Sequence, residues 1–151
     1  MTRVDFYGLT EVRPEARERF AVRLLTKAWR EGLRSVVLMD DIEGIARMDE
    51  ALWGESGAFL PHAPIESDVR APIRMATPAT LTEATLIEGA ASGLLVNLTD
   101  RVPEHFASFE RVAEIVCQDD EMRTRARAHY RFYRERGYPL EYHELGGARG
   151  R

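Results

Sequence analysis

Short apolar runs recur along the chain and predict strands. Residues 35–39 and 93–98 are continuous apolar runs, as expected of strands buried on both faces of a sheet. Residues 3–9 and 138–145 instead alternate between apolar and polar positions, which is typical of half-buried strands. A further strand is expected at 111–117, and residues 138–145 are expected at an edge of the sheet.

Helical spacing of apolar residues fills the segments between these strands. Residues 15–31 repeat apolar side chains every three or four positions, after a proline that suits a first helical turn. A second helix is expected to begin at Asp40 and Asp41, whose carboxylates can cap its amino terminus, and to end at Trp53. A short helix is expected over 103–109.

Prolines and glycines interrupt both patterns over residues 54–82, where 73–76 has the character of a strand. Residues 82–91 are compatible with a helical turn or with an ordered loop. The repeated order of strand, helix and strand predicts a three-layer α/β domain with a mostly parallel sheet flanked by helices. We expect a single domain over residues 1–145 and a disordered tail over 146–151.

Composition narrows the class of protein. The chain has 151 residues, of which 44% are hydrophobic, and a formal net charge of −4. It is therefore expected to fold, and not to be attracted as a whole to nucleic acid or to an acidic membrane. Cys117 is the only cysteine, which excludes an internal disulfide and a cysteine-based zinc cluster. The amino-terminal segment is too short and polar for a signal peptide, and no apolar run is long enough to span a bilayer, so a cytoplasmic protein is expected.

The most distinctive segment is the basic helix expected over residues 119–137. At about 100° per residue, four of its arginines fall in one narrow sector: Arg123, Arg127, Arg131 and Arg134. Tyr130 lies at the border of this sector, and Val116 comes just before the helix. Guanidinium groups beside an apolar notch suit a ligand that is both anionic and apolar, because arginine binds carboxylates through paired hydrogen bonds. A solvated basic face is the alternative interpretation.

No catalytic constellation accompanies this helix. The sequence holds neither a G-x-G-x-x-G turn nor a G-x-x-x-x-G-K-[ST] loop, and its four histidines lack the spacing of metal ligands. Asp40 and Asp41 could hold a ribose or a magnesium ion, but helix capping is favoured because a phosphate-binding loop is missing. Cys117 is interpreted as a small residue that closes a strand. We therefore expect a binding protein with no cofactor, no metal and no catalysis of its own.

Two large aromatic residues form a second candidate surface. Trp53 ends the second expected helix, and Phe59 follows in a proline-bounded loop. Side chains of this size in such places either cover the core or, where they are exposed, anchor a protein interface. The sequence leaves both possibilities open.

Several segments of the chain resemble the chi subunit of bacterial DNA polymerase III. The matching motifs occur in the family's order and at compatible spacing: VDFYGL at 4–9, KAWREG at 27–32, MDEALW at 48–53, FLPH at 59–62, LLVNL at 94–98 and RAHYRFYR at 127–134. The resemblance extends from about residue 3 to about residue 140. Residues 79–92 match no hallmark of the family and are assigned no role.

The resemblance implies a Rossmann-like, non-catalytic subunit of the clamp-loader complex, which acts in DNA replication. Family members bind the psi subunit and the acidic carboxyl-terminal tail of single-stranded DNA-binding protein (SSB), which ends in phenylalanine. In some relatives a helicase binds the psi-facing surface, and DNA is reached only indirectly. The tail-binding positions of the family match Val116, Arg123, Arg127, Tyr130 and Arg131, and the psi-facing aromatic positions match Trp53 and Phe59.

A direct nucleic-acid-binding module that uses the same arginine helix is the alternative. It predicts binding of naked oligonucleotide with a steep dependence on salt. The acidic net charge and the scarcity of stacking aromatics beyond Tyr130 and nearby rings argue against it.

Overall fold

A computed structural model describes residues 1–54, 59–86 and 93–145. Within these ranges the chain forms one seven-stranded sheet in the order β3-β4-β2-β5-β6-β1-β7, in which every pairing is parallel. The strands are β1 (Arg3–Gly8), β2 (Ser35–Leu38), β3 (His62–Pro64), β4 (Ile73–Ala76), β5 (Leu94–Asn97), β6 (Arg111–Val116) and β7 (Leu140–Glu144). The predicted α/β class is confirmed, and the sheet is wholly rather than mostly parallel.

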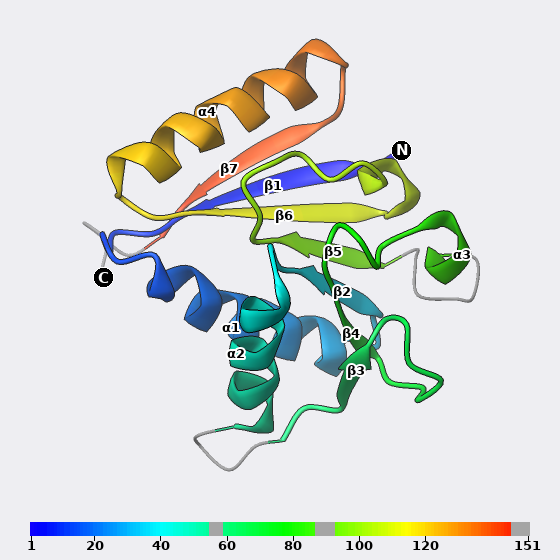
Figure 1. The fold of residues 1–151 in the computed structure, drawn as a ribbon. Coiled ribbons are helices and arrows are strands. Elements are labelled where there is room, and N and C mark those ends of the chain that lie inside the picture. The colour runs from blue at the N-terminus through cyan, green and yellow to red at the C-terminus, as the bar shows by residue number, and fades with distance from the viewer. Residues whose placement is uncertain (55–58, 87–92, 146–151) are drawn as a thin grey trace.

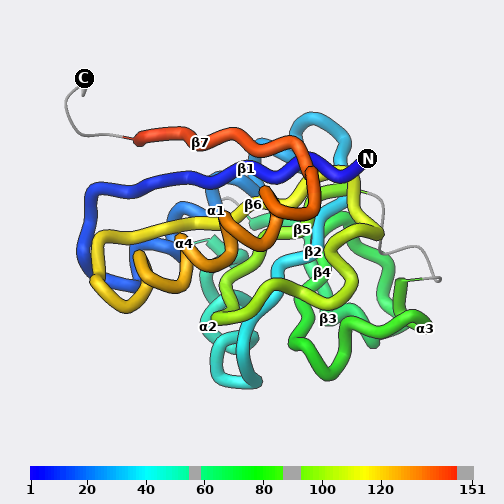
Figure 2. Tube along the Cα trace, turned by 90° about the horizontal axis from the view of Figure 1, so that it is seen from above, coloured from blue at the N-terminus to red at the C-terminus, as the bar shows by residue number. Residues whose placement is uncertain are grey.

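Helices cover both faces of this sheet (Figure 1). The helical segments are α1 (Glu15–Arg30), α2 (Ile42–Trp53), α3 (Glu83–Thr85), the 3-10 turn η2 (Phe106–Ser108) and α4 (Asp120–Glu135). Helices α1 and α2 lie on one face and α4 lies on the other, while β7 runs beside β1 at the outer edge (Figures 1 and 2). None of the helices in the described ranges is both long and apolar enough to cross a bilayer.

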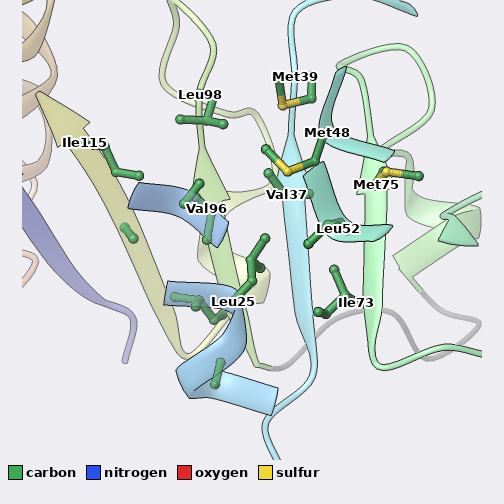
Figure 3. Close-up of a cluster of buried hydrophobic side chains, with 14 of the residues drawn as sticks. Leu25, Val37, Met39, Met48, Leu52, Ile73, Met75, Val96, Leu98 and Ile115 are labelled. Atoms are coloured by element: carbon green, nitrogen blue, oxygen red, sulfur yellow. The ribbon is translucent and has the colours of Figure 1, made fainter. Parts of the chain in front are cut away.

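Two apolar clusters hold the layers together. On the α1 and α2 face, the side chains of Leu25, Met48 and Leu52 pack against those of Val37 and Val96 from the sheet (Figure 3). The second cluster joins the opposite face of the sheet to α4 and η2, and its members include Val4, Phe6, Val36, Leu95, Phe106, Phe109 and Tyr133. Strands in the centre are therefore buried on both faces, which explains why β2 and β5 read as unbroken apolar runs.

Aspartate side chains cap the amino termini of α2 and α4. Asp41 accepts a hydrogen bond from the backbone amide of Gly44 at 2.9 Å, and Asp119 accepts one from the amide of Met122 at 3.1 Å. Helix capping is expected of Asp40 and Asp41, and in the structure Asp41 is the residue that caps the helix. Asp40 lies instead near Asp100, and burial together with the charge of that neighbouring carboxylate raises the pKa of Asp40.

The structure differs from the expected elements in three places. The sequence does not predict strand β3, because three residues that include Pro64 are too few to show a periodic pattern. In the structure this short strand pairs with β4. Residues 103–109 form only the 3-10 turn η2, whose tighter repeat brings Phe106 and Phe109 into the same cluster. Over 82–91 the described part is the helical turn α3, and the predicted tail at 146–151 lies outside the described residues.

Candidate functional site

A buried polar network sets the position of α4 on the sheet. Its centre is Glu114 in β6, whose carboxylate accepts hydrogen bonds from the Tyr133 hydroxyl at 2.8 Å and from the Asn97 amide at 3.0 Å. His129 Nδ1 lies 3.1 Å from the same carboxylate, and its Nε2 lies 2.9 Å from the carbonyl oxygen of Asp100. His129 and Tyr133 are one helical turn apart, so these contacts hold one side of α4 against β6.

The network also shifts the acid–base equilibria of its members. Burial raises the pKa of Tyr133, and the negative charge of Glu114 adds to that effect, so Tyr133 stays protonated and acts as a donor. Burial alone would lower the pKa of His129. The hydrogen bond and charge of Glu114 outweigh burial and leave that pKa above its ordinary value.

With this side of α4 fixed, a hollow of about 310 Å³ opens along its flank. We call it the α4 hollow, and its lining residues come from four parts of the chain: Phe6 in β1, Val116 and Gln118 at the end of β6, Arg123, Ala126, Arg127 and Tyr130 in α4, and Tyr142 and Glu144 in β7. The hollow therefore combines apolar side chains, two guanidinium groups and one carboxylate. It contains no arrangement of nucleophile and base.

Four of the five residues matched to tail binding line this hollow. Val116 is buried, and Tyr130 is half-buried with its ring centroid 5.2 Å from that of Phe6. Arg123 and Arg127 are exposed at the rim. Arg131 is also exposed on α4, one turn beyond Arg127, but it does not line the hollow.

Neighbouring groups modulate the charge of this rim. Arg123 forms an ion pair of 3.7 Å with the fully exposed carboxylate of Asp120, and Arg127 donates a long 3.5 Å hydrogen bond to the Thr124 hydroxyl. Exposed contacts of this kind are weak, so both guanidinium groups can turn toward a ligand. Glu144 is the one carboxylate among the lining residues.

Strand β7 supplies a wall of the hollow that the sequence did not reveal. The Tyr142 ring stacks on Phe6 with a centroid distance of 6.4 Å, and burial and the charge of Glu144 raise the pKa of Tyr142. A Cβ atom at Gly8 would collide with the Tyr142 hydroxyl, so glycine at that position lets the ring lie flat over β1. These contacts depend on the pairing of β7 with β1, which no local motif encodes.

Trp53 and Phe59 form a separate exposed patch at the end of α2. Their ring centroids lie 4.5 Å apart, and the two residues are 60% and 46% exposed, so the interpretation as lids over the core is wrong. His62 packs beneath them and is held by Leu60 and Asp49, with Nε2 at 2.8 Å from the Asp49 carboxylate. The patch is at the end of α2 and the hollow is beside α4, and these two helices lie on opposite faces of the sheet (Figure 1).

A larger hollow of about 830 Å³ lies between the end of α1 and the loop that precedes β4, near Trp29 and Arg70. It is no candidate for the site despite its size. The guanidinium of Arg74 on its wall donates to the carbonyl oxygens of Pro64 and Ser67, which is a structural role in holding the loop.

Comparison with known proteins gives a consistent result. The family model described as DNA polymerase III chi subunit, HolC, matches residues 1–141. The chain is 41% identical over 146 residues to DNA polymerase III subunit chi of Pseudomonas aeruginosa, covering 96% of this chain and 98% of that protein. It is 28% identical to the chi subunit of Haemophilus influenzae, with 94% and 96% covered, and 27% identical to that of Escherichia coli, with 82% of each covered. This chain belongs to the DNA polymerase III chi subunit family.

Proposed function

We propose that this protein is a non-catalytic accessory subunit of the DNA polymerase III holoenzyme that connects the clamp loader, through psi, to the acidic carboxyl-terminal tail of SSB. In this proposal the α4 hollow, together with Arg131 beside it, binds the tail. Trp53 and Phe59 bind psi. Because α2 and α4, which carry the two surfaces, lie on opposite faces of the sheet, both partners can be bound at once.

The main support for the proposal is that a single hollow has both an apolar floor and a rim of arginines. Val116, Phe6 and Tyr130 supply the floor, and Arg123 and Arg127 supply the rim. A cavity of about 150 Å³ accommodates a benzene molecule, so a hollow of about 310 Å³ has room for the ring of a terminal phenylalanine.

Both halves of the hollow are needed on energetic grounds. An exposed ion pair contributes about 0–1 kcal/mol, whereas micromolar affinity requires about 8 kcal/mol. The arginines alone are therefore insufficient, and burial of an aromatic side chain adds about 1.5–3 kcal/mol. A peptide that carries acidic residues and ends in phenylalanine with a free carboxylate uses both contributions.

The second surface has the character of a protein interface. Trp53 and Phe59 are large, exposed and in contact with each other, and such aromatics dominate the energy of many interfaces. The packing of His62 beneath them supports a defined shape for the patch.

A titration with a fluorescent acidic peptide that ends in phenylalanine tests the tail-binding site. We expect Arg127→Ala to weaken binding about tenfold, equivalent to about 1.4 kcal/mol, and removal of the terminal phenylalanine to weaken it at least as much. Arg30→Ala serves as a matched control, because Arg30 is an exposed arginine on α1 across the sheet. Unchanged affinity for both Arg127→Ala and the shortened peptide would contradict the proposal.

A further inference from the structure

Three side chains of the kind that binds metals meet where β1 and β7 pair. Asp5 of β1 and Glu141 and His143 of β7 each offer one ligand atom, and the three atoms lie within 4.8 Å of one another. No second group of this kind occurs in the part of the chain that the structure describes. The cluster is not used by either surface of the proposed function.

The strand register builds this cluster. Asp5 lies directly opposite Glu141, and Tyr7 lies opposite His143. Side chains two residues apart on a strand project from the same face, so Glu141 and His143 stand together beside Asp5. Tyr142 lies between them in sequence and projects from the other face, where it lines the α4 hollow. The cluster and the hollow are thus on opposite faces of the same two strands.

Neighbouring groups orient the ligand atoms. The Oδ1 atom of Asp5 lies 3.0 Å from Nε2 of His143, whereas its Oδ2 atom faces the guanidinium groups of Arg3 at 3.5 Å and Arg111 at 3.7 Å. The His143 ring stacks on Tyr7 with centroids 4.8 Å apart. These contacts hold the Asp5 carboxylate and the His143 imidazole in fixed orientations. Residues that contact metal ligands commonly have this effect.

The same arginines limit which ion can bind. Two guanidinium groups offset the charge of two carboxylates, so a hard cation held mainly by charge, such as Mg²⁺ or Ca²⁺, is not favoured. An imidazole nitrogen with two carboxylates suits a first-row transition ion such as Zn²⁺. The Asp5 side chain is only 3% exposed, but that of His143 is 33% exposed and Glu141 is exposed, so solvent can enter as a further ligand.

We propose that Asp5, Glu141 and His143 bind one divalent transition-metal ion of the Zn²⁺ type, with a coordination position left open to water. The ion joins β7, the last strand in the sheet order, to the neighbouring strand β1. Metal binding therefore secures the edge strand against separation from the sheet.

Calorimetric titration of the full-length, tag-free, chelator-treated protein with ZnCl₂ tests this site. We expect one binding site per chain in the wild type. Glu141→Gln and His143→Ala each remove one ligand and should weaken binding at least about tenfold. His105→Ala is the matched control, since it removes a histidine outside the cluster and should leave binding unchanged.

Two further measurements make the test specific. Zn²⁺ should raise the melting temperature of the wild type but not that of Glu141→Gln or His143→Ala, and MgCl₂ in excess should not displace Zn²⁺. Circular dichroism of the variants without metal verifies that they are folded, and His143→Gln replaces His143→Ala if the latter is not. Lack of Zn²⁺ binding by the wild type, wild-type affinity in both folded variants, or displacement by Mg²⁺ would overturn the proposal.

Discussion

Tyr133 donates a 2.8 Å hydrogen bond to Glu114 in the interior between α4 and β6. The same carboxylate contacts His129 one turn earlier on the helix, so a single buried charge anchors α4 at two positions. Arg127 and Tyr130 are carried on the same stretch of helix and line the hollow. The buried contacts on one side of α4 therefore fix the positions of Arg127 and Tyr130 on the other side.

Removal of the Tyr133 hydroxyl tests this anchoring. Tyr133→Phe keeps the buried ring but leaves Glu114 without one donor, so we expect the free energy of unfolding to fall by about 1–3 kcal/mol. Urea denaturation measures the change. Tyr142→Phe is the control, because that side chain is about half exposed and should change stability much less. Equal stability of Tyr133→Phe and the wild type would show that the bond does not anchor the helix.

The pH dependence of stability reports on His129. Its pKa is raised in the folded protein by Glu114, against the opposing effect of burial, so the folded state holds a proton on His129 more tightly than the unfolded chain. The resulting stabilisation is complete below the unfolded value of 6.5 and is lost as pH rises through the folded value. The difference in unfolding free energy between the wild type and His129→Gln should therefore shrink as the pH rises above 6.5. A difference that widened with pH would refute this assignment.

A charged residue in the aromatic patch should prevent association with psi. Trp53→Glu or Phe59→Glu places a carboxylate in the centre of an exposed apolar surface, and we expect co-purification with co-expressed psi to be lost. The melting temperature should stay close to that of the wild type, because both side chains are largely outside the core. Ile42→Glu is a control at another exposed apolar residue. Retention of psi by both patch variants would exclude this surface.

The carboxylate of Glu144 should oppose an acidic peptide. Glu144→Gln removes the one negative charge among the residues that line the α4 hollow, so we expect the peptide to bind about two- to fivefold more tightly. The gain should disappear at high salt. Glu141→Gln, measured in the presence of a chelator, is a control on the same strand, since Glu141 projects from the opposite face. A gain of the same size in both variants would mean that only net charge matters.

Local periodicity explains which parts of the fold could be predicted. The bounds of α1 and α4 and of the buried strands agree with the sequence patterns to within a few residues, because apolar spacing reflects burial directly. Strand β3 could not be found in this way, since it spans three residues and ends at Pro64. The sequence pattern likewise does not encode the order of strands in the sheet.

The candidate site likewise has a part that local spacing predicts and a part that depends on strand pairing. The arginines and Tyr130 lie on one helix, so helical spacing alone placed them side by side. Tyr142 lines the hollow because β7 pairs with β1, a strand far away in the sequence. The same pairing brings His143 to Asp5, which is 138 residues away in the chain. Glu114 and His129 do have a signal in the sequence: Glu114 is an acid inside an apolar run, and His129 lies on the same helical stripe as Tyr133.

In the proposed function, the arginine rim of the α4 hollow holds the terminal carboxylate of a peptide whose last ring enters the hollow. A double-mutant cycle tests it most directly, with the Arg123→Ala/Arg127→Ala variant on one side and a peptide amidated at its carboxyl terminus on the other, both measured by fluorescence anisotropy. We predict that amidation weakens binding to the wild type but has little effect on the variant, with a coupling energy of at least about 1 kcal/mol. Losses that simply add would contradict the claim.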